Sequence, residues 1–308
     1  MQPGNKRRVY ISEVVARDGF QIEPNFIPTE AKVKLINLLS RTGLAKIEVT
    51  SFTSPKAIPN LRDAEEVFKR VERVRGVIYS ALVPDVKGCE RAIGCAVDEI
   101  NMVMSASESH GRANLRKSPE DSLAQFAEIV KMPKDTHIAF NASISTAFGC
   151  PFEGIIPAER IVNIIERCAD MGVNGITLCD TTGIADPAQV FELCSEVRAL
   201  FPRVNFTVHF HNTRGMGLAN LLAALEAGIE RFDASLGGLG GCPFAPGSSG
   251  NICTEDTVHM LDRMGYETGV DLDRLLEIAR ALPVIVGHEV PGQVMRAGKA
   301  DRRYPRPE

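Results

Sequence analysis

The feature that most constrains the fold is a repeated alternation of short apolar runs with longer segments of helical period. The eight runs are RVYISEVVA from Arg8, then AKIEVTSF, GVIYSALV, DEINMVMSAS, HIAFNASI, NGITLCDTTG, NFTVHFHN and RFDASLGG. Two segments between them, 28–43 and 157–172, carry apolar residues at helical spacing and end on glycine. Another segment begins SPED at Ser118, which predicts a helix capped by serine and aspartate.

Consecutive strand-then-helix units predict parallel strands, because each helix returns the chain to the same end of the sheet. Eight such units predict an α/β fold of the (β/α)8 TIM-barrel type. We expect residues 1–308 to form one catalytic barrel domain, with 257–308 as a helical extension packed on the barrel. A doubly wound open sheet is the structural alternative, because periodicity does not show closure.

Charge and cysteine content exclude several classes of protein. The formal net charge is −4, so no overall basic field favours nucleic acid or a membrane surface. No apolar run reaches the roughly 18 residues that a membrane span needs. The eight cysteines show no C-x-x-C spacing and several lie in apolar runs, which indicates buried free thiols in a reducing compartment and argues against a zinc ribbon. We therefore expect a cytoplasmic location.

In such a barrel, catalytic groups lie at the carboxyl ends of the strands and in the loops that follow. The polar residues that fall there are Arg17 and Asp18 after the first run, Glu48 and Ser51 in the second, Asp180 and Thr181 in the sixth, and His209 and His211 in the seventh. These positions predict one polar mouth.

The H-F-H motif predicts a metal site. His209 and His211 are two residues apart on a strand, so their side chains point to the same face. A closed barrel brings Asp18 across the mouth toward them. Two imidazoles with a carboxylate, completed by an amide oxygen, suit octahedral Mg²⁺ or Mn²⁺, although ligand type alone does not exclude zinc. The alternative is one core histidine and one bonded to a loop.

Arg17 cannot lose its proton, and near a metal a guanidinium serves to hold an oxyanion. We expect its side chain to point to the other side of the turn from Asp18. The alternative role is a salt bridge to Glu13 or Glu48. Glu48 is expected to face inward, where it needs a partner such as Arg17.

The glycine-rich segment SLGGLGGCPFAPGSSGN, residues 235–251, follows the eighth run. Its glycines favour a loop that changes shape to cover a substrate. Cys242 lies in this loop rather than in an apolar run, and a thiol near cations acts as a nucleophile or a proton donor. A cysteine packed in a structural loop and a phosphate cradle are the alternatives, but no G-K-[ST] follows the glycines.

With these residues in view, the chain resembles the 3-hydroxy-3-methylglutaryl-CoA (HMG-CoA) lyases, a family of metal-dependent barrel lyases, from about Val9 to Leu261. The motifs that carry the resemblance are RDGFQIE, IEVTSFTSPKAIPN, CDTTG, HFHNTRGMGLAN and SLGGLGGCPFAPGSSGNICTED. The family cleaves HMG-CoA to acetyl-CoA and acetoacetate with Mg²⁺ or Mn²⁺. The resemblance thus implies an acyl-CoA substrate, a role in leucine degradation and ketone-body formation, and a homodimer.

Matched position by position, the resemblance implies a role for each motif residue. Asp18, His209, His211 and Asn251 would be the metal ligands. Arg17 would stabilise the thioester enolate, and Cys242 would protonate it after the loop closes. The resemblance further assigns Glu48 and Asp180 to catalysis. It assigns Gln21 and Ser51, together with Arg17, to substrate binding. Glu13 belongs to the first motif, and Glu255 matches a supporting acidic position.

Three departures from the family pattern concern the substrate. Pro24 stands where the lyases usually have lysine, SESHGRANLRKS at 107–118 replaces their usual run, and Phe244 replaces a tyrosine. A lyase for a related 3-hydroxy-acyl-CoA, such as citramalyl-CoA or a longer-branched homologue, is therefore an alternative. A synthase that condenses acetyl-CoA with a 2-oxo acid and a catalytically silent binding barrel are more distant alternatives.

Overall fold

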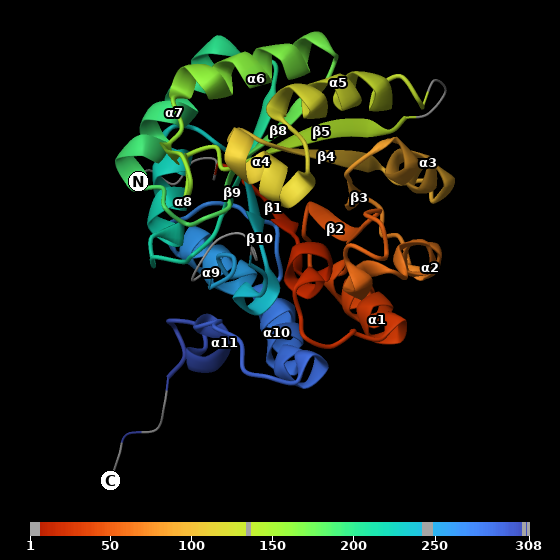
Figure 1. Cartoon of the computed structure of the whole chain (residues 1–308). Coiled ribbons are helices and arrows are strands. Elements are labelled where there is room, and N and C mark those ends of the chain that lie inside the picture. Colours follow the sequence, from red (N-terminus) through yellow and green to blue (C-terminus); the bar gives the residue numbers. More distant parts are fainter. Residues whose placement is uncertain (1–6, 134–136, 242–248, 304–305, 307–308) are drawn as a thin grey trace.

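Eight parallel strands close into a barrel in the order β1, β10, β9, β8, β5, β4, β3, β2 (Figure 1). The computed structural model describes residues 7–133, 137–241, 249–303 and 306. The barrel strands are β1 Tyr10–Glu13, β2 Lys46–Ser51, β3 Ile78–Val83, β4 Glu99–Ser105, β5 Ala139–Ser145, β8 Gly175–Asp180, β9 Asn205–Phe210 and β10 Arg231–Ala234. Closure excludes the open sheet, and the predicted TIM barrel is confirmed.

Helices follow the strands and surround the barrel (Figure 1). They are α1 Thr29–Leu39, α2 Ala64–Arg70, α3 Val86–Gly94, α4 Glu108–Leu115, α5 Pro119–Ile129, α6 Ala158–Asp170, α7 Pro187–Leu200 and α8 Gly217–Glu226. A short antiparallel hairpin of β6 Gly149–Cys150 and β7 Gly154–Ile155 lies between β5 and α6. The helix predicted from Ser118 is α5, and its capping box is formed by Ser118 and Asp121.

The chain after β10 forms three helices, α9 Thr254–Arg263, α10 Leu272–Val286 and α11 Val294–Ala297. Helix α9 packs against β1 and β10, while α10 packs against α1 and α9. The boundary expected at residue 257 therefore lies inside α9, a helix that covers the barrel itself.

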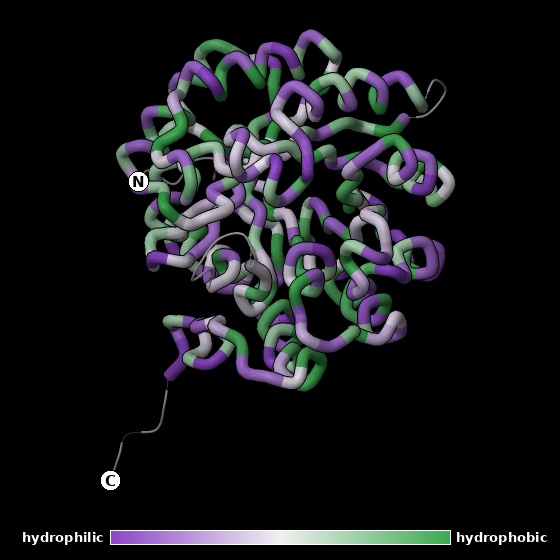
Figure 2. Tube along the Cα trace, in the orientation of Figure 1, coloured by the Kyte–Doolittle hydropathy of each residue, from purple (hydrophilic) through white to green (hydrophobic). Residues whose placement is uncertain are grey.

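The strands present an apolar face to the helices and a polar face to the barrel interior. In β4, β5 and β9 every second residue belongs to the hydrophobic core, as with Ile100, Ile144 and Val208. The residues in the opposite phase include Glu48, Asn101, Asn141, Ser143, Thr177, His209 and Asp233. This period of two follows from strand geometry, and the resulting alternation of hydropathy along the chain is visible in Figure 2. The barrel interior is thus unusually polar, because branched apolar residues normally fill it.

The first apolar run does not remain a strand to its end. Strand β1 stops at Glu13, and Val15–Gly19 forms a π-helical turn, η1, in which the amides of Arg17, Asp18 and Gly19 donate to the Val14 carbonyl. Alternation of faces ends with the strand, so both Arg17 and Asp18 lie buried at the barrel mouth.

The structure also bears on membrane spans and on the state of the cysteines. No helix within the described residues is long and apolar enough to cross a membrane. The seven cysteines in the described part of the chain are free thiols; all are buried except Cys95, which is partly exposed.

The Ser118 cap generates a test of stability. The Ser118 hydroxyl accepts from the Asp121 amide at 3.0 Å, and the Asp121 carboxylate accepts from the Ser118 amide at 3.0 Å. We expect Ser118→Ala to lower the free energy of unfolding by about 1 kcal/mol, because the Asp121 amide loses its acceptor and the Asp121 carboxylate loses the hydroxyl donor. Ser195→Ala, in the interior of α7, is the matched control and should change it by less than about 0.5 kcal/mol. Equal losses in chemical denaturation would contradict this assignment.

Candidate active site

The Asp18 carboxylate is the centre of the polar cluster at the barrel mouth. Its Oδ1 accepts from Arg17 Nη1 at 2.6 Å and from Gln21 Nε2 at 2.8 Å. Its Oδ2 accepts from Asn251 Nδ2 at 2.7 Å. Burial alone would raise the pKa of Asp18, but Arg17 and the two nearby histidines hold that pKa below its ordinary value. Asp18 is therefore a carboxylate at neutral pH.

The two histidines of β9 converge on Asp18. The Nε2 atoms of His209 and His211 are 3.2 Å apart, and they lie 3.9 Å and 3.8 Å from Asp18 Oδ2. Burial and the neighbouring His209 lower the pKa of His211 to about 4, so its imidazole is neutral at pH 7. A neutral imidazole keeps a lone pair for a metal ion.

Asp233 on β10 orients His209 from behind. Its Oδ2 lies 3.4 Å from His209 Nδ1, so the other ring nitrogen, Nε2, faces the cluster. Although burial opposes protonation, Asp233 and Asp18 raise the pKa of His209 above its ordinary value. A carboxylate on the far nitrogen is the usual partner of a metal-binding histidine. Asp233 was not predicted from the sequence. It could have been found as the acidic residue in the eighth run that alternates with apolar Phe232 and Ala234.

Arg17 lies between two carboxylates. Its Nη1 donates to Asp18, and its Nε donates to Glu48 Oε2 on β2. The expectation that Arg17 points away from Asp18 was wrong, because the π-helical turn places both side chains on one side. Of the two expected salt-bridge partners, Glu48 pairs with Arg17, whereas Glu13 bonds elsewhere. Burial would lower the pKa of Arg17, but Glu48 and Asp18 raise it further above its already high value.

Glu13 and Glu255 support the backbone around the site. Glu13 accepts from the amides of Val15 and Leu236 and from the Thr254 hydroxyl, and therefore joins η1 to both ends of the glycine segment. Glu255 accepts from the Gly237 amide at 3.1 Å. Burial raises the pKa of Glu13 to about 7 and that of Glu255 to about 8. Both carboxyl groups are fully buried.

Asn251 is held beside His211 by an antiparallel bridge between the two residues. Its Nδ2 also donates to the Leu239 carbonyl at 2.9 Å. The amide nitrogen, rather than the oxygen, therefore faces Asp18. Asn251 would hold a metal ion through Oδ1, which requires its side-chain amide to turn over from the orientation seen here.

Glycines at the described ends of the loop permit this close approach. Gly240 has φ +112°, and a Cβ there would lie 2.4 Å from Asn251 Nδ2 and 2.9 Å from Asp18 Oδ2. Gly250 has φ +103°, and its Cβ would meet the Gly238 carbonyl at 2.2 Å. These two glycines are required by packing against the site. Residues 242–248, including Cys242 and Phe244, lie outside the described part of the chain.

A cavity of about 970 Å³ opens above the cluster. Of the predicted site residues, it is lined by Arg17, Asp18, Gln21, His209 and His211. Further lining residues that we did not predict are Lys56, Leu82, Val103, Arg116, Lys117, Ser143, Ser145, Cys179 and Asp233. Several of them come from the loop after β2 and from the end of α4, where only the folded chain shows which side chains face the cavity.

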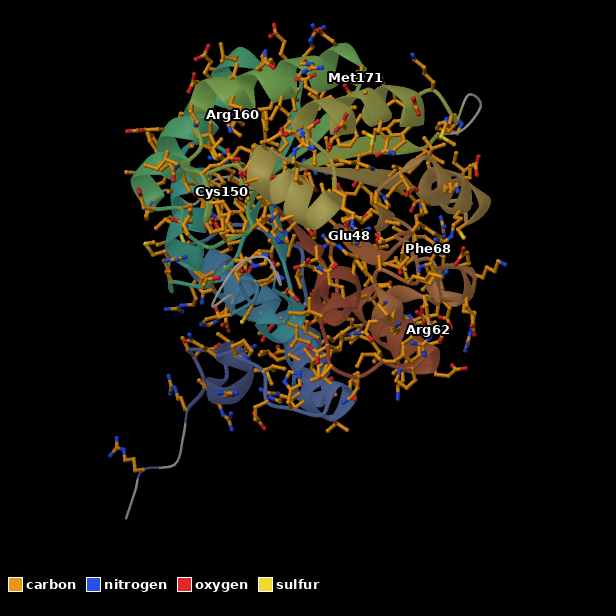
Figure 3. The ribbon with its side chains drawn as sticks, in the orientation of Figure 1. Glu48, Arg62, Phe68, Cys150, Arg160 and Met171 are labelled. Carbon is orange, nitrogen blue, oxygen red and sulfur yellow. The ribbon has the colours of Figure 1, made fainter. Side chains whose placement is uncertain are left out.

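Besides Asn251, Glu13 and Glu255, described above, three further predicted residues do not line this cavity. Glu48 is bonded to Arg17 and lies toward the centre of the molecule in Figure 3. For comparison, the labelled Arg62 and Met171 lie on the outer helices. Ser51 is bonded to Thr53, with the two hydroxyl oxygens 2.7 Å apart. Asp180 accepts from the amides of Ile184 and Ala185, and burial raises its pKa to about 6. These contacts favour a supporting role for Ser51 and Asp180, and their direct roles stay predictions.

The donor set fits a divalent cation. Donor atoms of Asp18, His209 and His211 lie within 4.8 Å of one another, and all three residues are buried. Around them, Asp18, Glu48 and Asp233 bring three carboxylates against the single guanidinium of Arg17. Buried charge of one sign is costly unless it is compensated, and a divalent cation would compensate it. Nitrogen and oxygen donors of this kind are compatible with Mg²⁺, Mn²⁺ and Zn²⁺.

A (β/α)8 barrel with a buried carboxylate–histidine–histidine cluster at its carboxyl-end mouth defines a class, the barrel enzymes with a candidate divalent-metal centre. The chain belongs to the HMGL-like family, whose sequence model matches residues 8–282. The family resemblance drawn from the motifs is thereby confirmed.

Individual relatives cover nearly the whole chain. Hydroxymethylglutaryl-CoA lyase YngG of Bacillus subtilis (strain 168) is 45% identical over 294 residues, which are 96% of this chain and 98% of that protein. The (R)-citramalyl-CoA lyase of Chloroflexus aurantiacus is 37% identical over 94% of this chain and 95% of its own. The structure of an HMG-CoA lyase from A. baumannii, in complex with coenzyme A and 3-methylmalate, is 49% identical, with a TM-score of 0.94 and coverage of 97% and 98%.

The cluster generates a test of metal binding. We expect His211→Ala to lower Mn²⁺ affinity at least about tenfold, because one of three clustered donors is lost. His137→Ala is the matched control, because His137 is exposed and precedes β5 at the opposite end of the barrel. Calorimetric titration with Mn²⁺ measures both variants. Equal affinity in His211→Ala and wild type would remove His211 from the metal site.

Proposed function

We propose that this protein is a divalent-metal-dependent carbon–carbon lyase that cleaves HMG-CoA to acetyl-CoA and acetoacetate. The observation that carries the proposal is the placement of Arg17 against the Asp18–His209–His211 cluster in the wall of one large cavity. Membership of the HMGL-like family and the names of the full-length relatives support the same reaction.

The Asp18–His209–His211 cluster would act on the substrate hydroxyl through a metal ion, and Arg17 would act on the thioester. A bound divalent ion, Mg²⁺ or Mn²⁺, would lower the pKa of a tertiary hydroxyl group so that the adjacent carbon–carbon bond can break. Asp18, His209 and His211 would hold the ion, with Asn251 as a further ligand. Gln21 keeps Asp18 oriented through its 2.8 Å bond.

Arg17 would stabilise the negative charge that develops on the thioester oxygen. Its Nε and one Nη1 donor are held by Glu48 and Asp18, and a guanidinium has five N–H donors in all. The remaining donors are available to an oxyanion in the cavity that Arg17 lines. Fixed donors of this kind need no reorganisation when the charge forms.

The outer wall of the cavity suits the phosphates of an acyl-CoA. Lys56 and Arg116 are exposed there, and Lys117 is half-buried with its Nζ 2.9 Å from the Pro84 carbonyl. Three cations around one opening favour an anionic ligand at that end, although Asp85 also lines it. The A. baumannii lyase, whose structure is a complex with coenzyme A, supports a ligand of this kind, and the acyl group would then lie toward the metal cluster.

Cys242 completes the proposal as the proton donor. The thiol would protonate the acetyl-CoA carbanion after the glycine segment closes and excludes water. Loop closure, the homodimer and a cytoplasmic location belong to the same proposal. Closure rests on the glycines of the loop, the homodimer on the family resemblance, and the location on the free thiols.

A second candidate substrate is citramalyl-CoA or another 3-hydroxy-acyl-CoA. The cavity wall near the cluster carries short side chains, Ser143, Ser145 and Thr181, which leave room for a different acyl group. The citramalyl-CoA lyase among the relatives and the 3-methylmalate in the A. baumannii structure support this candidate.

A panel of 3-hydroxy-acyl-CoA thioesters tests the substrate. We expect HMG-CoA to be cleaved with the highest kcat/KM in the presence of Mg²⁺ or Mn²⁺, and chelation of the metal to abolish turnover. Acetyl-CoA formation is the measurement. Faster cleavage of citramalyl-CoA would favour the second candidate, and release of CoA from acetyl-CoA plus a 2-oxo acid would indicate a synthase.

Cys242→Ser tests the proton donor. We expect kcat to fall about 100- to 10,000-fold, because a serine hydroxyl is a much weaker acid than a thiol, while Mn²⁺ affinity stays unchanged. Cys95→Ser is the control, since Cys95 lies just after α3 and does not line the cavity. Turnover of Cys242→Ser within about threefold of wild type would remove the thiol from the mechanism.

A further inference from the structure

Beneath Arg17, the barrel interior contains a chain of hydrogen bonds that reaches across four strands. Asn101 on β4 donates from Nδ2 to Glu48 Oε1 at 2.6 Å. Asn101 Oδ1 accepts from Asn141 Nδ2 at 2.8 Å and from Ser143 Oγ at 2.8 Å. Asn141 also donates to Thr177 Oγ1 at 3.0 Å. All these residues are buried, and Ser143 lines the cavity.

The direction of these bonds is set by charge. Glu48 accepts from Arg17 through Oε2 and, as a carboxylate, has no proton to donate from Oε1. The Asn101 atom that faces Glu48 is therefore the amide nitrogen, and its oxygen must face Asn141 and Ser143. Asn101 thus has both ends of its amide occupied in a single orientation.

The surrounding backbone leaves space for this chain. Gly175 on β8 pairs with Asn141 in the parallel register, and a Cβ at Gly175 would lie 2.7 Å from Asn141 Oδ1. On β3, between β2 and β4, the residue beside Glu48 is the small Ser80. The strands therefore carry small residues at the two positions where a larger side chain would crowd the polar chain.

We propose that Asn101 is a positioning residue that orients Glu48, and through Glu48 holds the Arg17 guanidinium against Asp18 in the cavity wall. Asn101 does not line the cavity, and its bond toward Arg17 is the one to Glu48, so its effect on Arg17 passes through the carboxylate of Glu48. Ser143 connects the same amide to the cavity surface. The inference rests on the proposed function, in which Arg17 stabilises the thioester oxyanion.

The placement of Arg17 depends on this contact because Glu48 is bonded on both oxygens. Without the Asn101 donor, Glu48 Oε1 is a buried carboxylate oxygen with no partner in the described network, and the carboxylate is free to rotate. Rotation would move Oε2 and weaken its hold on Arg17 Nε. A small displacement of a charge-stabilising group reduces the rate of the chemical step more than the binding of the remote parts of the substrate.

Asn101→Leu tests the proposal, because leucine has the same branching of heavy atoms as asparagine and cannot hydrogen-bond. We expect kcat to fall at least about tenfold while KM for the thioester and Mn²⁺ affinity stay within about threefold of wild type. Thr177→Val is the matched control; it removes the far acceptor of Asn141 without touching Asn101 or Glu48, and should retain kcat within about threefold. A kcat of Asn101→Leu within threefold of wild type would overturn the proposal.

A double-mutant cycle with Glu48→Ala separates positioning from general damage to the fold. If Asn101 acts through Glu48, Asn101→Leu should have little further effect on kcat once Glu48 is removed. Independent, multiplying losses would overturn the proposal. The cycle uses whichever thioester the wild-type enzyme cleaves, so a different substrate leaves the test intact.

A crystal structure of Asn101→Leu tests the positioning role without an activity assay. It applies even if the wild-type protein cleaves no thioester, and that result would count against the proposed function alone. We expect Arg17 to be displaced from Glu48 in the folded variant, whereas Thr177→Val should keep the pairing. An unchanged Arg17–Glu48 contact in the Asn101→Leu structure would overturn the positioning role.

Discussion

The Arg17 guanidinium lies between two buried carboxylates, Glu48 on β2 and Asp18 in η1, and the geometry of the mouth follows from this pairing. It fixes one oxygen of Asp18, so the other oxygen faces the two histidines of β9. It also leaves the cluster with more negative than positive charge, which is the condition under which a divalent cation binds. Removing Arg17 would leave two buried carboxylates without their shared cation, a costly state in a protein interior.

The polar interior that surrounds this pairing is stable because its groups are satisfied. Period-two alternation places apolar side chains under the helices and polar side chains inside the barrel, where they bond across neighbouring strands. Three side chains illustrate this arrangement. Asn101 donates a hydrogen bond to Glu48 and accepts one from Asn141. A barrel filled with apolar side chains would be simpler to stabilise, but it would not hold a guanidinium in one orientation.

Glycines in the segment 235–251 can serve close packing or a change of loop shape, and the composition of the segment does not show which glycine serves which. At Gly240 and Gly250 glycine is needed because the backbone passes too close to Asn251, Asp18 and Gly238 for any Cβ, at positive φ. Those residues are positioned rather than loose, and Glu13 holds the backbone beside them. The change of loop shape that the glycines were expected to permit stays a prediction, because Cys242 lies outside the described residues.

Sequence by itself determined the eight strand-then-helix units, the capped helix at Ser118 and the family, because these depend on local periodicity and on motifs that are contiguous in the chain. It also placed Asp18, His209 and His211 at one mouth. Closure of the strands into a barrel, which periodicity does not show, was decided by the tertiary structure. Only the tertiary structure decided that Arg17 turns toward Asp18, since that depends on a π-helical turn stabilised by the folded mouth. Asp233 and Asn101 likewise emerged only there, because each acts on a residue of another strand, and the distance between two strands in a barrel is set by closure.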